Sequence, residues 1–512
     1  MAEEPTRTES LESGLAEQMA VRREHLESLA RTGQDPFGSR FDRNATAASI
    51  QAEFGHLPPD GEGGLVRVAG RISSRRGHGK ATFMDLVDLS GRIQLYLKID
   101  ELGEESYQRL DLVDLGDLLT ITGTVFRTRR GELSVRVREW AVAAKALRPP
   151  PEKWHGLRDV EVRYRQRYAD LLSNAEVRQT FVLRSRIISA IRHYLDDRGF
   201  MEVETPTMSA LAGGAAARPF ITHHNALDMK LYLRIATELY LKRCIVGGLE
   251  KVYEIGRIFR NEGLSTRHNP EFTMLELYEA WSDYHGMMEI TEGILDHVCT
   301  HVLGTHQIEV EGQTIDLKPP FARRTMDELL RQHAGVSLNE LRQGDRAREL
   351  AGELGIPLAD KAHSLAHLID KIFEATCEEH LVQPTFVLDY PIELSPLAKR
   401  HAEDPGLTYR FELFVRGSEL ANAFSELNDP FDQRERFEQQ QALKDVDEEA
   451  HPLDEDFLTA LEYGMPPTGG LGIGIDRLIM LLTGKTTIRD VLLFPLMRPR
   501  VEVPGTAGPD QI

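Results

Sequence analysis

Cysteine is scarce in this sequence, with three residues in 512. Cys244, Cys299 and Cys377 lie far apart along the chain, which argues against a disulfide framework or a cysteine-based zinc site and favours a reducing compartment. No run of about 18 uncharged apolar residues occurs, so no membrane span is expected. The acidic, polar N-terminus also lacks the basic-then-apolar order of a signal peptide. We therefore expect a soluble, cytoplasmic protein.

Positive charge is in short supply as well. Lysine and arginine number 61 against 81 aspartates and glutamates, for a net charge of −20. This balance argues against a protein that binds nucleic acid over its whole surface, although it permits a local basic patch. The length of 512 residues predicts two or three domains.

The N-terminal residues 1–61 are predicted to form a helical extension that is partly disordered. From Ser10 onward, Leu11, Leu15 and Met19 recur every fourth residue with charges between them, which is typical of one helix face. Residues 1–9 lack such a pattern, and we expect disorder there.

Residues 62–146 change character and favour a small β-barrel. Short apolar runs alternate with glycine-containing turns, and a helix is expected at 104–110 between the third and fourth runs. This order matches a five-stranded OB-type barrel. The predicted strands are Leu65–Ile72, Ala81–Asp88, Ile93–Ile99, Leu118–Arg127 and Glu132–Ala141.

Basic residues follow the first strand of this barrel. Arg71, Arg75, Arg76 and Lys80 come shortly before Phe83, and positive charge beside an aromatic ring suits single-stranded nucleic acid. A basic loop next to a core phenylalanine explains the same composition equally well.

The rest of the chain is predicted to be a linker followed by one large mixed α/β domain. A helix is expected at Val177–Arg198, and another is expected to begin at Glu238 with Thr237 as its cap. The predicted segments are a linker at 147–175, the domain at 176–505, a helical insertion at about 325–381 and a disordered tail at 506–512.

The segment from Phe259 to Thr273 carries the strongest functional signal. It places Arg260, Arg267, His268 and Phe272 around a turn between two alternating apolar runs, which predicts two strands joined by a long hairpin loop. Guanidinium groups suit phosphate oxygens, and a flat ring suits a base. A solvated charged hairpin is the alternative, but it explains the aromatic and histidine residues poorly.

The second of these strands is predicted to place aromatic and polar side chains on one face of the sheet. Phe272, Met274, Glu276 and Tyr278 alternate with residues that face the other side of the sheet. A glutamate flanked by apolar residues needs a cationic partner, because an unpaired buried carboxylate is costly. That partner is either a protein arginine or an amine of a ligand.

A second acidic cluster lies between residues 411 and 426. Glu412 and Glu419 are candidate ligands for Mg²⁺, which takes carboxylate and phosphate oxygens, while Asn422 and Glu426 share one side of the chain. Strict alternation places Glu419 on the opposite face, so a bulge or turn near Gly417 is required. Exposed strand carboxylates are the alternative for any one of these residues.

A glycine-rich strand at 469–474 leads into an apolar helix that carries Arg477. The string is weak evidence for a dinucleotide fold, because no βαβ unit surrounds it. Its glycines would instead let backbone lie against a nucleotide.

These residues together resemble the class II aminoacyl-tRNA synthetases, and most closely the bacterial lysyl-tRNA synthetase family. Three class II motifs occur in order: the helix from Val177 through Pro206, the segment from Phe259 to Phe272, and Gly470–Arg477. The segments beginning at Gly213, Ala236 and Phe424 resemble lysine-specific ones. The resemblance implies an OB-fold anticodon-binding barrel and an antiparallel-sheet catalytic domain with helices, which dimerises through the first motif.

The family also implies the substrates and a role for each matching residue. The substrates would be ATP, with bound Mg²⁺, L-lysine and tRNA(Lys). The implied catalytic residues are Arg260 and Arg477. The implied ATP site contains Arg260, Glu262, His268, Phe272 and Arg477. The implied magnesium ligands are Glu412 and Glu419. The implied lysine site contains Gly214, Glu238, Glu276, Tyr278, Asn422 and Glu426. The implied anticodon-reading residues are Arg71, Phe83, Gln94 and Glu132.

Other functions fit parts of the sequence. Aspartyl and asparaginyl synthetases share the barrel and the motifs, but an anionic or neutral side chain would not suit Glu276 and Glu426. A shortened paralogue that lysylates an elongation factor lacks the barrel. An RNA-binding regulator on an inactive synthetase core would not need every catalytic position to be filled.

Overall fold

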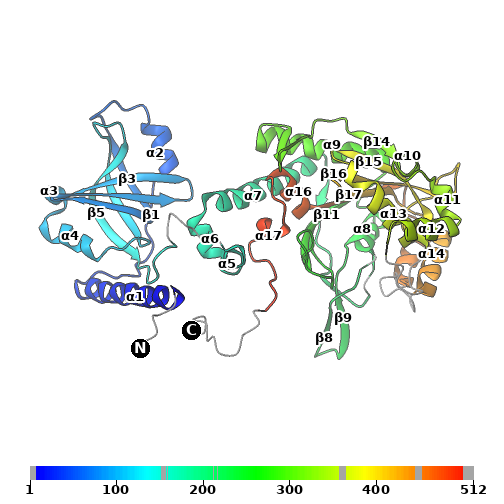
Figure 1. Ribbon diagram of the computed structural model, residues 1–512, viewed down its shortest axis with the longest axis horizontal. Helices are drawn as coiled ribbons and strands as arrows, with labels where there is room; N and C mark the ends of the chain where they lie inside the picture. The colour runs from blue at the N-terminus through cyan, green and yellow to red at the C-terminus, as the bar shows by residue number, and fades with distance from the viewer. Residues whose placement is uncertain are drawn as a thin grey trace. The chain divides into compact units, whose positions relative to one another are not determined.

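The computed structural model describes residues 7–151, 157, 159–211, 213–215, 217–356, 365–443 and 453–499. The chain forms two compact units, Met1–Arg158 and Asp159–Ile512 (Figure 1). No helix among the described residues is long and apolar enough to cross a membrane. The predicted tail at 506–512 lies outside the described residues.

The first unit is built around a closed barrel, as the sequence predicted. Its strands are β1 (Glu62–His78), β2 (Ala81–Asp88), β3 (Gly91–Lys98), β4 (Leu118–Arg127) and β5 (Leu133–Ala144), in the order β1-β2-β3-β5-β4. Between β3 and β4 lie α3 (Ile99–Leu102), α4 (Glu104–Gln108) and the 3₁₀ turn η1 (Arg109–Leu112). Alternate residues such as Met84, Leu86 and Leu95 fill the barrel interior.

Two helices precede the barrel in the same unit. α1 (Arg7–Arg31) begins three residues before the predicted start at Ser10, and α2 (Ala47–Phe54) starts with a capping box at Thr46. Arg22 of α1 donates to the carbonyls of Leu115 and Ala146 at 2.9 and 2.8 Å. These bonds hold the long helix against the barrel.

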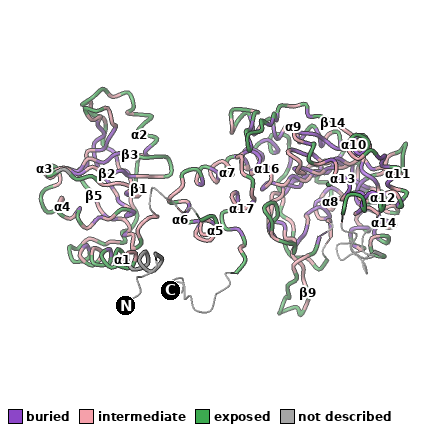
Figure 2. Tube along the Cα trace, viewed as in Figure 1, coloured by how far each residue is buried: buried purple, intermediate pink, exposed green. Residues whose placement is uncertain are grey.

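The second unit is organised by an eight-stranded sheet with the order β14-β15-β16-β17-β18-β11-β10-β6. Its strands are antiparallel except for the parallel pairs at the two edges, β14 with β15 and β10 with β6. Buried residues concentrate in these strands (Figure 2). The bounds are β6 (Met201–Glu202), β10 (Lys251–Phe259), β11 (Glu271–Ala280), β14 (Ala322–Thr325), β15 (Thr385–Pro391), β16 (Leu407–Val415), β17 (Ser418–Ser425) and β18 (Thr468–Gly474).

Helices cover the sheet and small strand pairs extend from it. The principal helices are α7 (Ala175–Asp196), α8 (Glu238–Val246), α9 (Tyr284–Val298), α14 (Pro430–Leu443), α15 (Glu455–Glu462), α16 (Ile475–Leu482) and α17 (Ile488–Val491). The remaining strands are β7 (Met208–Ser209), β8 (Ile221–His224), β9 (Met229–Leu233), β12 (Gln307–Val310) and β13 (Gln313–Asp316). Short turns follow α9 at η2 (Cys299–Leu303) and β15 at η4 (Ile392–Leu394).

The helical material predicted near 325–381 connects the parallel strands β14 and β15. It contains α10 (Met326–His333), α11 (Leu338–Arg342), α12 (Asp345–Glu353), α13 (Leu365–Thr376) and η3 (Glu378–His380), and it has an apolar core of its own that includes Leu330, Ile369 and Phe373. A parallel pair requires a crossover connection, and the insertion supplies it.

The predicted linker at 147–175 contains the division between the two units, and its second half is helical. Two helices occupy it, α5 (Val160–Arg165) and α6 (Arg167–Ser173). Arg167 is fully buried, bonds Asp170 at 2.5 Å and donates to the carbonyls of Arg489 and Leu493. The charged composition of this segment predicted a linker. The guanidinium of Arg167 is instead buried in the second unit, where these partners satisfy its hydrogen bonds.

Candidate active site

One cavity of about 780 Å³ in the second unit collects almost all of the residues predicted for catalysis and substrate binding. Its floor is formed by β11, β16, β17 and β18, and the hairpin loop after β10 contributes its rim. The predicted residues that line it are Gly214, Glu238, Arg260, Glu262, His268, Phe272, Glu276, Tyr278, Glu412, Glu419, Asn422 and Arg477. Glu426 is not in this set.

The hairpin β10–β11 places the first group of these side chains. Phe272, Met274, Glu276 and Tyr278 alternate along β11 and all line the cavity. The guanidinium of Arg260 lies 5.2 Å from the centre of the Phe272 ring. Its buried Nε has no hydrogen-bond partner among the described residues, so this donor is available to an anion.

His268 and Arg477 face each other across the rim. Nε2 of His268 lies 3.4 Å from Nη2 of Arg477, and Nδ1 lies 3.0 Å from the Ser265 hydroxyl. Burial and then the charge of Arg477 lower the pKa of His268. Glu262 is exposed on the same loop. Arg260, Arg267 and Arg477 also line this part of the cavity and make it cationic, so that it can accept an anionic ligand.

The two candidate magnesium ligands meet because β17 contains a bulge. Glu412 pairs with Asn422 and Leu413 with Ala421, but Phe414 pairs with Glu419, so Leu420 is the extra residue. The bulge brings Glu419 to the cavity side, as the alternation argument required. The turn itself uses positive φ at Arg416 and Gly417, 54° and 60°.

Both carboxylates already have protein partners. Glu412 bonds Arg410 at 2.6 Å and accepts from the Tyr390 hydroxyl at 3.0 Å, and Glu419 bonds Arg477 at 3.2 Å. Burial, and then the neighbouring charge of Glu419, raise the pKa of Glu412 to about 7. Two neighbouring acids that repel each other, both partly exposed in the cavity, fit a divalent cation that also binds phosphate and water.

The far end of the cavity is strongly acidic. Glu238, Glu276 and Glu426 are 8%, 5% and 1% exposed, and the buried phenol of Tyr278 lies among them. Burial, and then the charge of Glu238, raise the pKa of Glu276 to about 7. Its Oε1 accepts the Thr237 amide at 3.2 Å, while Oε2 has no partner among the described residues.

Thr237 therefore has a different role from the predicted one. It occupies the N-cap position of α8, but its hydroxyl makes no capping bond. Its backbone N–H instead orients Glu276. The helix start thus positions two acids, Glu276 through this amide and Glu238 directly in the first turn.

Glycines allow the close packing around these acids. Gly214 has a φ of 90°, and a Cβ there would lie 3.4 Å from the Cβ of Glu238. At Gly470 of β18, a Cβ would lie 1.9 Å from Oε1 of Glu426 and 2.6 Å from Cε1 of Tyr278. The glycine-rich strand is thus needed for side-chain room as well as for access to a nucleotide.

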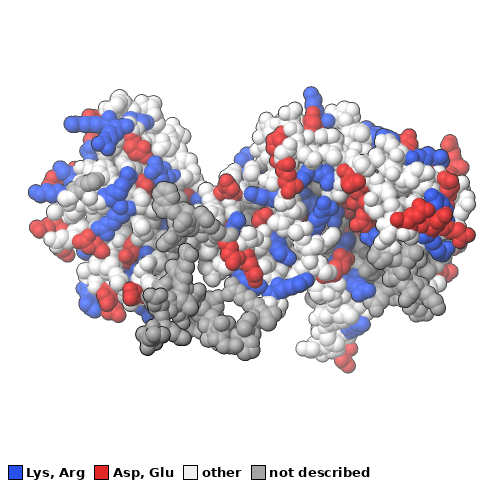
Figure 3. Space-filling model, in the orientation of Figure 1, with Lys and Arg blue, Asp and Glu red and all other residues white. Residues whose placement is uncertain are grey.

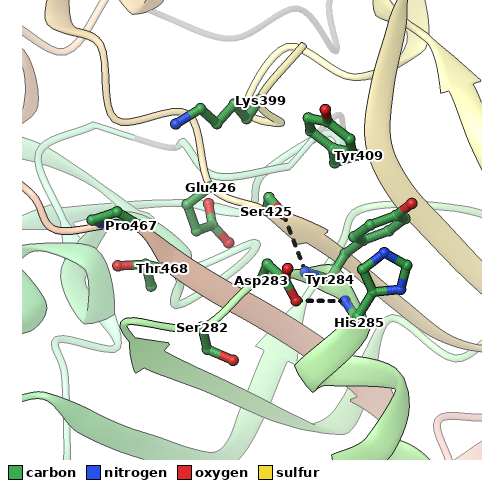
Figure 4. A pocket seen from close by; sticks show the side chains of 10 residues that line it. All are labelled: Ser282, Asp283, Tyr284, His285, Lys399, Tyr409, Ser425, Glu426, Pro467 and Thr468. Atoms are coloured by element: carbon green, nitrogen blue, oxygen red, sulfur yellow. Dashed lines mark hydrogen bonds between the residues drawn. The ribbon is translucent and has the colours of Figure 1, made fainter. Parts of the chain in front are cut away.

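Glu426 lines a second cavity of about 300 Å³, together with Asp283, Tyr409 and Thr468 (Figure 4). Its Oε1 nevertheless lies beside Gly470, which lines the main cavity. Glu426 therefore stands in the wall between the two spaces. Its carboxylate is paired with Lys242, a residue that the sequence interpretation did not single out. The four-residue spacing of Glu238 and Lys242 on one helix was the available signal.

The predicted anticodon residues share the outer face of the barrel. Arg71 lies opposite Val87, and Gln94 opposite Asp85 and Ser134. Gln94 accepts the Ser134 hydroxyl at 3.0 Å, and Glu132 pairs with Arg92 at 2.8 Å. Lys and Arg side chains are interspersed with acidic ones on the visible surface of this unit (Figure 3).

An aromatic partner on the same face was missed in the sequence. The rings of Phe83 and Tyr96 are 5.0 Å apart, and Tyr96 and Phe126 are 5.7 Å apart. Tyr96 follows Gln94 by two positions on β3, so strand alternation could have identified it.

Comparison with known proteins agrees with this geometry. Residues 66–143 match the OB-fold nucleic acid binding domain, and residues 159–498 match the tRNA synthetases class II (D, K and N). The lysine--tRNA ligase of Moorella thermoacetica is 56% identical over 94% of this chain and 98% of its own length. Those of Pelotomaculum thermopropionicum and Halalkalibacterium halodurans are 57% and 54% identical, over 96% of this chain and 96% and 98% of their own lengths. The chain therefore belongs to the family of class II tRNA synthetases (D, K and N).

Proposed function

We propose that this protein ligates L-lysine to tRNA(Lys) at the expense of ATP. The observation that carries the proposal is the acidic end of the cavity. Three buried carboxylates, Glu238, Glu276 and Glu426, have one buried ammonium among them, that of Lys242. A ligand with two ammonium groups balances the remaining charge, whereas an acidic or amide side chain does not. The likeness to lysine--tRNA ligases along nearly the whole chain supports the same substrate.

ATP would occupy the cationic part of the cavity. Arg260 would hold the α-phosphate and the lysine carboxylate, His268 the terminal phosphates, and Glu262 the adenine edge. Adenine would stack between Phe272 and Arg477. The unpartnered Nε of Arg260 and the glycines of β18 support this placement.

Lysine would lie along β11 toward the acidic end. Gly214 and Glu238 would receive its α-ammonium, with Asn422 close to its carboxylate. Glu426, Glu276 and Tyr278 would receive the ε-ammonium. The burial of these groups supports the assignment, because charge recognition strengthens when water is excluded.

Two displacements would complete the reaction. A carboxylate oxygen of lysine attacks the α-phosphorus, and the bond to pyrophosphate breaks. The terminal ribose hydroxyl of tRNA then attacks the activated carbonyl and releases AMP. No protein nucleophile is needed, so the side chains contribute positioning and charge stabilisation, chiefly through Arg260 and Arg477.

Glu412 and Glu419 would hold Mg²⁺ against the phosphates. The ion would neutralise phosphate charge when bound. The mutual repulsion of these two acids supports the assignment, since a cation between them relieves it.

The outer face of the barrel would read the anticodon through Arg71, Phe83, Gln94 and Glu132. Stacking on an aromatic ring and hydrogen bonding to base edges are the usual means of reading single strands. We also propose a cytoplasmic homodimer that pairs through the segment containing α7.

ATP–pyrophosphate exchange measured with each of the twenty amino acids tests the proposal. Lysine should support exchange, and the same enzyme should then charge tRNA(Lys). Exchange with aspartate or asparagine in place of lysine would instead identify one of the related specificities. Binding of tRNA without charging would point to a regulatory RNA-binding role.

A further inference from the structure

Lys242 is a fully buried lysine at the acidic end of the cavity. It lies one helical turn after Glu238 on α8, and its Nζ is 2.6 Å from Oε1 of Glu238. On the other side the same Nζ is ion-paired with Oε2 of Glu426, the residue that follows β17. One ammonium group therefore joins two of the three carboxylates that the proposed function assigns to lysine recognition.

Aromatic rings enclose the Lys242 ammonium. Its Nζ lies 5.5 Å from the centre of the Phe424 ring and 6.0 Å from that of Phe457. Ring faces attract a cation and exclude water from it. The side chain therefore has a defined direction from the helix to Glu426.

The charges at this end of the cavity depend on Lys242. Burial alone would lower the pKa of Lys242, but Glu238 and Glu426 outweigh it and raise the pKa. Burial raises the pKa of Glu426 well above its ordinary value, and Lys242 opposes that shift. Without the ammonium, Glu426 would face Glu238 and Glu276 with no compensating charge, and its pKa would rise further.

The ion pair leaves one oxygen of Glu426 for a ligand. Oε2 faces Lys242, whereas Oε1 has no hydrogen-bond partner among the described residues and lies beside Gly470. A second carboxylate, Glu276, also has a free oxygen. Fixing Oε2 thus determines which oxygen can meet an incoming cation.

We propose that Lys242 is a positioning residue that determines amino-acid specificity: by pairing with Oε2 of Glu426 it turns Oε1 toward the substrate ammonium. The inference rests on the proposed lysine ligase function and deepens it. Lys242 does not line the main cavity, so it acts on the substrate through Glu426. Lys242 compensates the charge of one of the three carboxylates. The two ammonium groups of one substrate lysine compensate the other two.

The test compares Lys242→Met with Lys251→Met. Methionine retains much of the length of lysine and removes the charge. Lys251 pairs with Glu279 at 2.7 Å and does not line the cavity, so it is the matched control. The KM values for lysine and for ATP are measured by pyrophosphate exchange from pH 6 to 9, together with the Tm of each variant.

Lys242→Met should raise the KM for lysine at least tenfold and leave that for ATP within twofold. The rise in lysine KM on acidification should begin at a higher pH, because Glu426 binds a proton more readily. The groups that face Glu426 are Lys242, Glu238, Glu276 and Tyr278, and the pKa of Glu276, raised to about 7 by burial, lies within the pH range measured. An unchanged lysine KM and pH profile would overturn the inference, as would equal increases in both KM values.

A double variant keeps the inference testable if Lys242→Met does not fold. Lys242→Met with Glu426→Gln removes both members of the ion pair and leaves no uncompensated charge between them. Its KM for lysine should match that of Glu426→Gln alone. A KM increase equal to the product of the two single-variant increases would contradict the inference that Lys242 acts through Glu426. Absence of lysine-dependent exchange in the unmodified protein would instead refute the proposed function itself.

Discussion

Arg477 and Glu419 are joined by two hydrogen bonds from a single nitrogen. Nη1 of Arg477 donates to the backbone carbonyl of Glu419 at 2.8 Å and to its Oε2 at 3.2 Å. The arginine proposed to cover adenine is thus held by a carboxylate proposed to bind magnesium. The two parts of the proposed nucleotide site are coupled through this contact.

Glu419→Gln should weaken the use of ATP and leave lysine recognition intact. The change keeps the carbonyl contact to Arg477 but removes the charge, and a hydrogen bond to a charged group contributes about 1.5–3 kcal/mol. We expect the KM for ATP to rise about tenfold, with a higher Mg²⁺ requirement. Steady-state exchange at several Mg²⁺ concentrations measures both, with the exposed Glu403→Gln as control. A change in the lysine KM alone would contradict the assignment.

Lysine binding should release a proton near neutral pH. Burial raises the pKa of Glu276 to about 7 in the unliganded protein, and a bound ammonium would lower it again. The affinity for lysine should therefore fall as the pH drops below about 7, by up to tenfold per pH unit if one proton is released. Calorimetry in buffers of different ionisation enthalpy measures the release, which should decrease in Glu276→Gln. Equal proton release in that variant would exclude Glu276.

The same shift affects stability with a definite sign. The folded-state pKa of Glu276 lies above the model-peptide value of 4.5. Its contribution to stability is therefore fully present below about pH 4.5 and is lost as pH rises through about 7. Bound lysine should offset this loss, so the increase in Tm on adding lysine should be larger at pH 8 than at pH 6.

Gly470→Ala should damage lysine binding far more than Gly472→Ala. A Cβ at residue 470 would overlap Glu426 and Tyr278, whereas at 472 the nearest atom is the flexible Met274 Cε at 3.0 Å. Overpacking of this kind costs about 1–3 kcal/mol. We expect the KM for lysine to rise at least fivefold in Gly470→Ala only. Similar KM values for lysine in both variants would contradict the steric role of Gly470.

Phe83→Leu should weaken tRNA charging without affecting amino-acid activation. Stacking of a base on an aromatic ring contributes about 1–3 kcal/mol, and Phe83 shares the barrel face with Tyr96. The KM for tRNA should rise about fivefold to a hundredfold by that estimate, while pyrophosphate exchange stays normal. Phe83→Tyr keeps the ring and is the matched control. Loss of charging in both variants would indicate packing instead of stacking.

Local sequence patterns predicted most of the strands that carry the site. β2 and β4 have the predicted bounds, and β10 and β11 are the two strands predicted on either side of the hairpin loop. These strands alternate apolar and polar residues with a period of two, which one buried face imposes. The motifs and the order of elements also identified the family, which the comparisons confirm.

Composition gave the wrong expectation of burial where charged residues have partners far away in the sequence. Arg167 lies in a segment that resembles a solvated linker, but its guanidinium is satisfied by carbonyls more than 300 residues away. The role of Lys242 was missed in the same way: its spacing from Glu238 indicates only the local pair, whereas its second partner Glu426 is distant in the sequence. No local pattern reveals such long-range pairs.

The sequence alone determined the periodic strands, the OB-type barrel and the class II motifs, and it predicted a set of side chains suited to a nucleotide and an amine. Only the tertiary structure decided how these side chains share charge. It placed Glu426 in the wall between two cavities and paired it with Lys242, and it joined Glu419 to Arg477. The reason is physical: periodicity is set by which face of a segment is buried, whereas charge compensation depends on groups that meet only when distant segments pack.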